Sequence, residues 1–139
     1  MGSFADFWEN EILDHLFMKG SYTMPTNLWV GLSTADPADD EGGLAEPTIP
    51  TGGYARVSTD GDDWDVAAAG ATANAEILTF PESTAAWSSG ASPLTHFAIF
   101  DAATAGNMVA HGSLSVSRTV NAAGVTLRFP VGELDVTLD

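Results

Sequence analysis

The sequence predicts a mainly β fold: an antiparallel β-sandwich of the jelly-roll or immunoglobulin type, with one amphipathic helix at its N-terminus. Three observations favour this class. Only residues 1–20 show a helical period, short apolar or alternating segments recur through residues 26–139, and no second amphipathic helix follows that would connect parallel strands. Because 139 residues fit one ordinary domain, we expect a single domain made of the helix, residues 1–20, and the sandwich, residues 26–139.

The helix is expected to run from Ser3 to Met18. Ser3 suits the N-cap, Asp6 lies in the first turn where the helix dipole favours an acid, and Gly20 suits the stop after the last turn. One face of this helix is broad, apolar and aromatic. It either packs on the domain's own sheet or docks on a partner subunit or a larger assembly. The candidate interface residues are Phe4, Phe7, Trp8, Leu13 and Phe17.

The stretch 94–116 predicts a β-hairpin around which the rest of the chain is organised. Its first arm carries Phe97, Ile99 and Phe100, so apolar residues occupy both alternations of the strand. A strand of this kind is covered on both faces, and we therefore place it centrally in the sheet. Residues 101–107 supply the short and turn-forming residues that connect the two arms.

The remaining strands are short and are separated by irregular turns. Residues 35–53 lose all periodicity and are rich in Asp, Glu, Gly and Pro, which indicates a long exposed loop that points outward, as does the acidic turn that follows residue 59. Residues 81–93 form another expected loop. The strands expected outside the hairpin are residues 26–34, 54–59, 75–80, 125–129 and 134–138.

The charge balance limits the partners that this surface can bind. The chain has 19 acidic against 4 basic side chains, a formal net charge of -15. Direct binding to nucleic acid or to anionic lipid is therefore disfavoured, and such a surface suits a salt-rich, marine or halophilic setting. No apolar run approaches the roughly 20 residues that span a bilayer, so no membrane insertion is expected.

No constellation of residues predicts an enzyme or a cofactor. His111 and Ser113 lie on one face of a strand, but they lack the Gly-x-Ser-x-Gly context of a nucleophile elbow. Antiparallel pairing can bring His96 near His111, whereas His15 lies on the helix, and a zinc site would need a further ligand. The absence of cysteine removes disulfides and thiolate metal sites. We expect no catalytic residues, and core or interface histidines that are satisfied by backbone groups.

Two weaker binding sites can be read from the predicted loops. The carboxylates of Asp60, Asp62, Asp63 and Asp65 form a weak calcium candidate, but the run lacks the spacing and the closing Glu of an EF-hand, which favours a solvated acidic turn.

Trp64 and Trp87 both fall in predicted loops, where an exposed indole can stack on a sugar ring. They are the candidate residues of a host-glycan-binding module.

Seven segments of the chain, in this order, resemble a family of small structural proteins of tailed viruses that is commonly labelled phage tail fibre protein. They are residues 7–15, 22–25, 28–37, 52–57, 77–81, 95–104 and 132–139. The resemblance implies a non-enzymatic protein located in the virion.

Similarly sized β-rich proteins of tailed viruses also serve as capsid decoration, and no shaft-like repeat is present in this chain. We therefore expect a capsid decoration or turret-type protein that assembles as a homo-oligomer, with a trimer favoured, together with other virion proteins such as the major capsid protein. The alternatives are a tail fibre, tail-tip or collar component, and a host-glycan-binding module.

Overall fold

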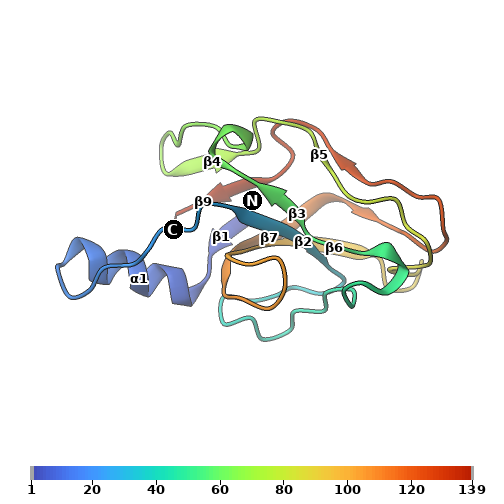
Figure 1. Ribbon diagram of the computed structural model, residues 1–139, viewed down its shortest axis with the longest axis horizontal. Helices are drawn as coiled ribbons and strands as arrows, with labels where there is room; N and C mark the ends of the chain where they lie inside the picture. Colours follow the sequence, from blue (N-terminus) through green and yellow to red (C-terminus); the bar gives the residue numbers. More distant parts are fainter. Residues whose placement is uncertain (1, 139) are drawn as a thin grey trace.

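A computed structural model describes residues 2–138 of the chain, which contain nine strands, one α-helix and two short 3-10 helices (Figure 1). In chain order these are β1 (Gly2–Phe4), α1 (Asp6–Leu16), β2 (Leu28–Ser33), η1 (Thr51–Gly53), β3 (Val57–Thr59), η2 (Gly61–Asp63), β4 (Ala71–Ala73), β5 (Leu78–Thr79), β6 (Leu94–Phe100), β7 (Met108–Arg118), β8 (Arg128–Phe129) and β9 (Asp135–Thr137). Within this described part, no helix has the length and apolar character needed to cross a membrane.

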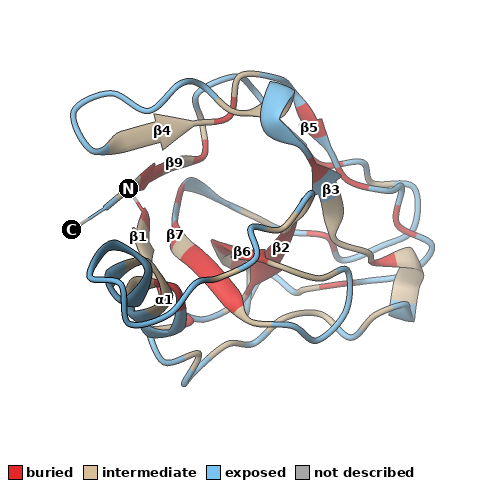
Figure 2. Cartoon of the chain, turned by 60° about the vertical axis from the view of Figure 1, so that its left-hand side comes forward, coloured by how far each residue is buried: buried red, intermediate tan, exposed pale blue. Residues whose placement is uncertain are grey.

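Seven strands form one sheet in the order β3-β2-β6-β7-β1-β9-β4, and β5 pairs with β8 in a separate two-stranded sheet. The large sheet curls, so that its strands follow an open curve from β3 round to β4 (Figure 2). The mainly β class with one N-terminal helix is thus confirmed. One pair departs from the antiparallel prediction: β1 and β9 run parallel, with Gly2 opposite Val136, which makes the large sheet mixed.

The predicted hairpin is confirmed as the centre of the sheet. β6 lies between β2 and β7, and its residues from Phe97 to Phe100 are all buried. A Cβ added at Gly112 would lie 2.8 Å from the Phe97 ring, so a glycine at this position leaves the space that the ring occupies. In the connecting turn, Asp101 accepts hydrogen bonds from the backbone N–H and the side chain of Asn107 at 2.8 and 2.9 Å.

The main core fills the concave side of the large sheet. Leu32, Phe97 and Leu134 of the large sheet or its flanks belong to one buried cluster with Leu78 and Phe129 of the two-stranded sheet. The β5–β8 pair therefore acts as a small second layer, and the result is sandwich-like. Because both layers bury large apolar side chains, this cluster supplies most of the hydrophobic stabilisation.

The other face of the sheet is covered by part of residues 35–53, a segment that the sequence predicts to point outward. The segment has little regular structure, as predicted, but Leu44 packs on a buried cluster that includes Phe100 and Met108. The carboxylate of Glu41 accepts a hydrogen bond from the Met108 N–H at 2.6 Å. The expectation of a wholly outward loop was wrong, because a strand with apolar residues on both faces needs a cover on each.

A buried ion pair fastens this covering segment to the sheet. Arg56 donates to both carboxylate oxygens of Glu46, at 2.8 and 2.7 Å, and its guanidinium lies 3.3 Å from the centre of the Phe100 ring. Only 4% of the Arg56 side chain is exposed. The Tyr54 hydroxyl donates to the same Glu46 and accepts the Leu32 N–H, and burial, followed by the charge of Glu46, raises the pKa of Tyr54 far above its ordinary value.

The helix is shorter than predicted at its start. Ser3 is not the N-cap: it lies in β1, opposite His111, and the helix is preceded by Ala5 without any side-chain cap. Pairing of β1 with β7 outcompetes the cap because it satisfies several backbone groups at once. At the other end Met18, and not Gly20, takes the positive φ of 58°, while the N–H groups of Lys19 and Gly20 both donate to the Asp14 carbonyl.

The other predicted strands are present but shorter. Residues 26–34 and 54–59 contain β2 and β3, whereas 75–80, 125–129 and 134–138 are reduced to β5, β8 and β9. The sequence analysis missed β1 and β4 because each is three residues long and neither shows a clear apolar alternation.

Candidate functional site

Helix α1 divides its apolar residues between the core and the surface. Trp8 is only 7% exposed and joins the main core, so one side of the helix packs on the domain's own sheet, as the first of our two alternatives expected. Other positions of the helix are left open. We define the α1 patch as the large apolar residues of α1 and of its C-terminal end that are 44 to 68% exposed: Phe7, Leu13, Leu16 and Phe17.

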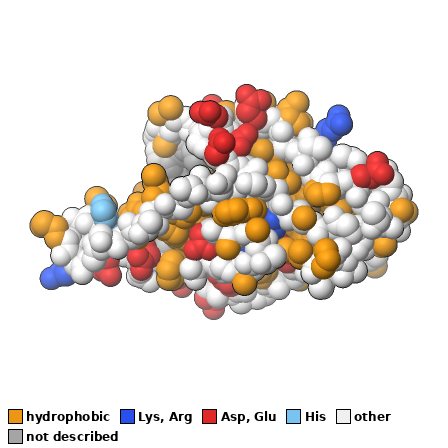
Figure 3. Space-filling model, in the orientation of Figure 1, with side chains coloured by type: hydrophobic (Ala, Val, Ile, Leu, Met, Phe, Trp, Pro, Cys, Tyr) orange, Lys and Arg blue, Asp and Glu red, His pale blue; other side chains and the backbone are white. Residues whose placement is uncertain are grey.

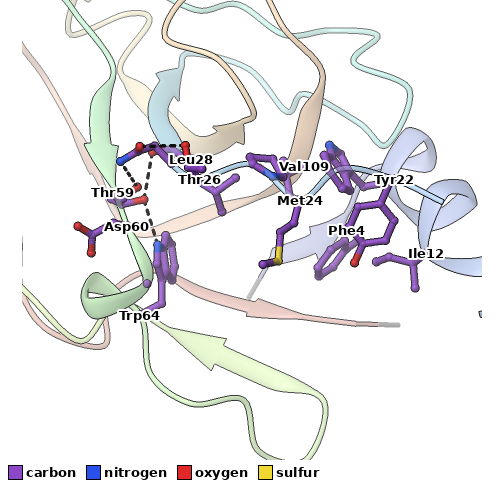
Figure 4. Close-up of a pocket in the computed structure, with 14 residues that line it drawn as sticks. Phe4, Ile12, Tyr22, Met24, Thr26, Leu28, Thr59, Asp60, Trp64 and Val109 are labelled. Carbon is purple, nitrogen blue, oxygen red and sulfur yellow. Dashed lines mark hydrogen bonds between the residues drawn. The ribbon is translucent and has the colours of Figure 1, made fainter. Parts of the chain in front are cut away.

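An apolar groove of about 550 Å³ lies beside α1. Phe4 of β1 and Ile12 of α1 line one wall, and Trp64, which follows η2, lines the other. Met24 and Tyr22 also line the groove, and in Figure 4 the Met24 side chain lies between Trp64 on one side and Phe4 and Tyr22 on the other. This arrangement brings three distant parts of the chain around one apolar hollow.

Residues 18–27, which we call the strap, connect α1 to β2 and form one side of the groove. Within residues 2–138, positions 21–25 of the strap make no backbone hydrogen bond. Tyr22 packs edge-on against Trp8 with ring centres 5.3 Å apart, whereas Met24 is 74% exposed. The strap is therefore held mainly by aromatic packing.

The packing beneath the strap leaves one polar group unsatisfied. The indole Nε1 of Trp8 is buried and finds no hydrogen-bond partner among residues 2–138, and Trp8 also lines the groove. A buried N–H without an acceptor costs about 1–3 kcal/mol.

At the end of the groove near η2, Trp64 is half-buried and donates its indole N–H to the Thr59 hydroxyl at 3.0 Å (Figure 4). Asp60 lines this end of the groove, and Figure 3 shows acidic side chains gathered near β4, with apolar side chains along α1. The exposed Asp60 and Asp62 make this end of the groove negative.

The four aspartates of the calcium candidate are used, in part, to shape their own turn. The Asp60 side chain accepts the Asp62 N–H, and the Asp63 side chain accepts the Asp60 N–H, both at 2.9 Å, which forms a capping box around η2. Asp65 lies just beyond this turn. Among residues 2–138, no group of three or more His, Asp or Glu side chains could hold a metal ion.

The hairpin does bring His96 and His111 to one place. Both face Asp36 of the covering segment, with side-chain nitrogen to oxygen distances of 3.9 and 3.6 Å, and His111 Nε2 lies 2.9 Å from Asp39 Oδ1. Antiparallel pairing predicts the approach of the two histidines, but their partners are aspartate side chains and not the backbone groups that were expected, because Asp36 and Asp39 lie more than fifty residues earlier in the chain. His15 lies apart, against Tyr22.

Trp87 is not in an exposed position, contrary to our expectation. Only 8% of its surface is accessible, its indole N–H donates to the Gly52 carbonyl at 2.7 Å, and its ring packs edge-on against Tyr54. The loop that carries it folds back onto the core because the indole is large enough to fill the space beside Tyr54. A sugar-stacking site needs a free ring face, which burial removes from Trp87.

Sequence reasoning also missed several residues of the groove. Ile12, Tyr22, Met24 and Leu28 line it, yet none of them was singled out as a site residue. The available signal was the pair of large side chains Tyr22 and Met24, which lie between the helix and the first strand in a segment without strand or helix period.

A search of curated proteins finds no match to this chain. A family model described as podophage GP4 fiber I protein gp80, Gp80, matches residues 3–137, which is nearly the whole sequence. This match confirms the resemblance to tailed-virus fibre proteins that the separate sequence segments indicated. The chain therefore belongs to the Gp80 family of podophage GP4 fiber I proteins, and it is a structural protein of a tailed-virus particle.

Proposed function

We propose that this chain is a non-enzymatic subunit of a tailed-virus fibre that joins the particle through the α1 patch. The observation that carries the proposal is the exposure of four large apolar side chains on a single short helix and its C-terminal end, with Leu16 and Phe17 exposed to 67 and 68%. Large apolar side chains that gather at the surface are typical of protein–protein interfaces.

The rest of the molecule is consistent with a structural role. The two acidic loops, which carry the most potential ligand groups, are used to build the fold. The acidic segment covers the sheet, and the capping box shapes the turn at η2. The patch serves contacts with copies of this chain, for which a trimer is the favoured symmetric assembly, or with other virion proteins such as the major capsid protein.

The number of copies per particle distinguishes two possible positions of this protein, in a fibre or on the capsid. The family description supports a fibre, whereas the compact unit without a repeat supports capsid decoration, the placement favoured by the sequence analysis. Quantitative mass spectrometry of purified particles, normalised to the major capsid protein, measures the number directly. A fibre component is expected in the order of a dozen copies and a decoration protein in the order of hundreds, because shell symmetry multiplies each site. Absence from the particle would overturn both placements.

A further inference from the structure

We propose that the groove beside α1 binds a polypeptide segment of another virion protein, in which apolar side chains have a lysine or arginine within a few positions. This inference rests on the proposed function, because it names the chemistry of one partner in the assembled particle. It is distinct from the α1 patch, because none of the four residues of that patch lines the groove.

The apolar part of the site sets the kind of ligand. The groove is bounded by Ile12, Tyr22, Met24 and Trp64, and its 550 Å³ is room for a few side chains. The apolar surface does not stop at the groove: Phe7, 44% exposed, packs edge-on against Trp8 at 5.9 Å. A surface that continues from a hollow onto a helix fits a segment with successive anchors better than it fits one small molecule.

The negative charge at one end of the groove favours a basic partner. The protein carries a net charge of -15, none of the groove-lining residues is basic, and Asp60 lies at one end of the groove beside the exposed Asp62. Two of the four basic side chains, Arg56 and Arg118, are already paired with glutamates. A second copy of this chain, or an anionic lipid surface, would bring like charge to this end, whereas a basic segment of a different protein complements it.

The unsatisfied Trp8 N–H agrees with a peptide occupant. A peptide has a carbonyl acceptor at every residue, whereas an aliphatic ligand has none. Nε1 is buried, so a peptide carbonyl needs a local shift to reach it, and Tyr22 of the strap packs against the same indole. Among residues 2–138, positions 21–25 make no backbone hydrogen bond, which lowers the cost of a shift of the strap.

The test uses the protein in assembled particles. A photo-cross-linking benzophenone amino acid is placed at Met24, which lines the groove, and in a matched particle at Val66, which is 94% exposed and lies outside it. The expected result is a cross-link from position 24 alone to a segment of another virion protein that has apolar residues and a Lys or Arg within a few positions. A cross-link to a second copy of this chain, to lipid, or to an acidic segment overturns the proposal.

The absence of any cross-link at position 24 also overturns it, provided the protein is present in the particle. Absence of the protein from the particle is a different result, because it overturns the proposed function itself.

A synthetic peptide with the cross-linked sequence then tests the site in solution. Met24→Glu and Val66→Glu add the same charge at two exposed positions, so only the first should weaken binding, by about tenfold or more, because it places a carboxylate in an apolar groove. Wild-type affinity should also fall several-fold between low and physiological salt, because screening weakens the attraction of a basic peptide to Asp60 and its neighbours. Equal binding by the two variants, or affinity that does not respond to salt, contradicts the proposal.

Discussion

Two irregular segments of this protein behave in opposite ways. Residues 35–53 are acidic and rich in turn-forming residues, yet they are fastened to the sheet by the buried Glu46–Arg56 pair, by Glu41 on Met108 and by Leu44 in a buried cluster. The strap, residues 18–27, has no acidic residue and carries large apolar side chains, yet Met18 and Met24 are 90 and 74% exposed. Polarity along the chain therefore does not predict which segment is covered.

The difference has a physical cause. A segment stays on the surface of a sheet when its polar groups form hydrogen bonds or ion pairs with the protein in place of those with water. The covering segment has such partners on β2, β6 and β7. The strap lacks them between positions 21 and 25, and its apolar residues are shielded only in part. A segment of that kind in a virion protein is expected to find its remaining contacts in another chain.

The largest expected effect comes from breaking the buried pair. Arg56→Ala leaves the Glu46 carboxylate buried without its cation and frees the turn carbonyls of Ala102 and Ala105, which Arg56 holds at 2.9 and 2.8 Å. We expect a loss of about 3–5 kcal/mol in the free energy of unfolding, measured by denaturant titration. Arg128→Ala removes the same charge from an exposed position of β8 and should change stability by about 0.5 kcal/mol or less. Equal losses in the two variants would contradict the role of the pair.

A smaller loss of stability is expected from a steric conflict that displaces the covering segment from the sheet. A Cβ at Gly31 would lie 2.6 Å from the Glu46 carboxylate and 3.3 Å from the Phe100 ring, so Gly31→Ala should cost about 1–3 kcal/mol. Hydrogen exchange should then rise first in residues 41–46. Gly90→Ala, where nothing lies within 4 Å, is the control and should leave both stability and exchange nearly unchanged. Unaltered exchange in residues 41–46 of Gly31→Ala would show that Glu46 does not depend on this space.

The pH dependence tests the phenol in the same network. The folded pKa of Tyr54 is raised above the ordinary value of 10.0, so above about pH 10 the unfolded chain releases this proton while the folded chain keeps it. Stability from this group is therefore complete below pH 10 and falls by about 1.4 kcal/mol per pH unit above it. In Tyr54→Phe this part of the loss of stability above pH 10 should disappear. Tyr22→Phe, which removes one phenol from the strap, is the control. Parallel stability curves for wild type and Tyr54→Phe above pH 10 would refute the assignment.

The smallest effect on folding, but the largest on assembly, is expected at the α1 patch. Leu13→Ser and Phe17→Ser replace side chains that are 52 and 68% exposed, so each should change the free energy of unfolding by about 0.5 kcal/mol or less. Incorporation into particles, measured by mass spectrometry, should fall about tenfold in the double variant because the interface loses two anchors. Val66→Ser with Val116→Ser, which are also exposed, is the matched control. If the double α1 variant is incorporated normally, the α1 patch does not belong to the assembly surface.

Much of the fold follows from local sequence patterns, and the predictions that were wrong share one cause. The hairpin of β6 and β7 was predictable because apolar residues on both alternations of residues 94–100 require burial on both faces. Ser3 was placed wrongly because a cap is a local signal, whereas pairing of β1 with β7 joins residues more than a hundred positions apart. Trp87 was misplaced for the same reason: its partners, Gly52 and Tyr54, are far away in the sequence.

The sequence by itself determined the mainly β class, the N-terminal helix, the central hairpin and, through its resemblance, the structural role in a tailed virus. Periodicity and composition act over a few residues, and these features need no more than that. The tertiary structure alone decided which apolar residues of α1 are exposed, that an acidic segment covers the sheet, and that Phe4, Met24 and Trp64 meet around one groove. These outcomes depend on contacts between distant residues, because burial and hydrogen-bond satisfaction are settled only when the whole chain has packed.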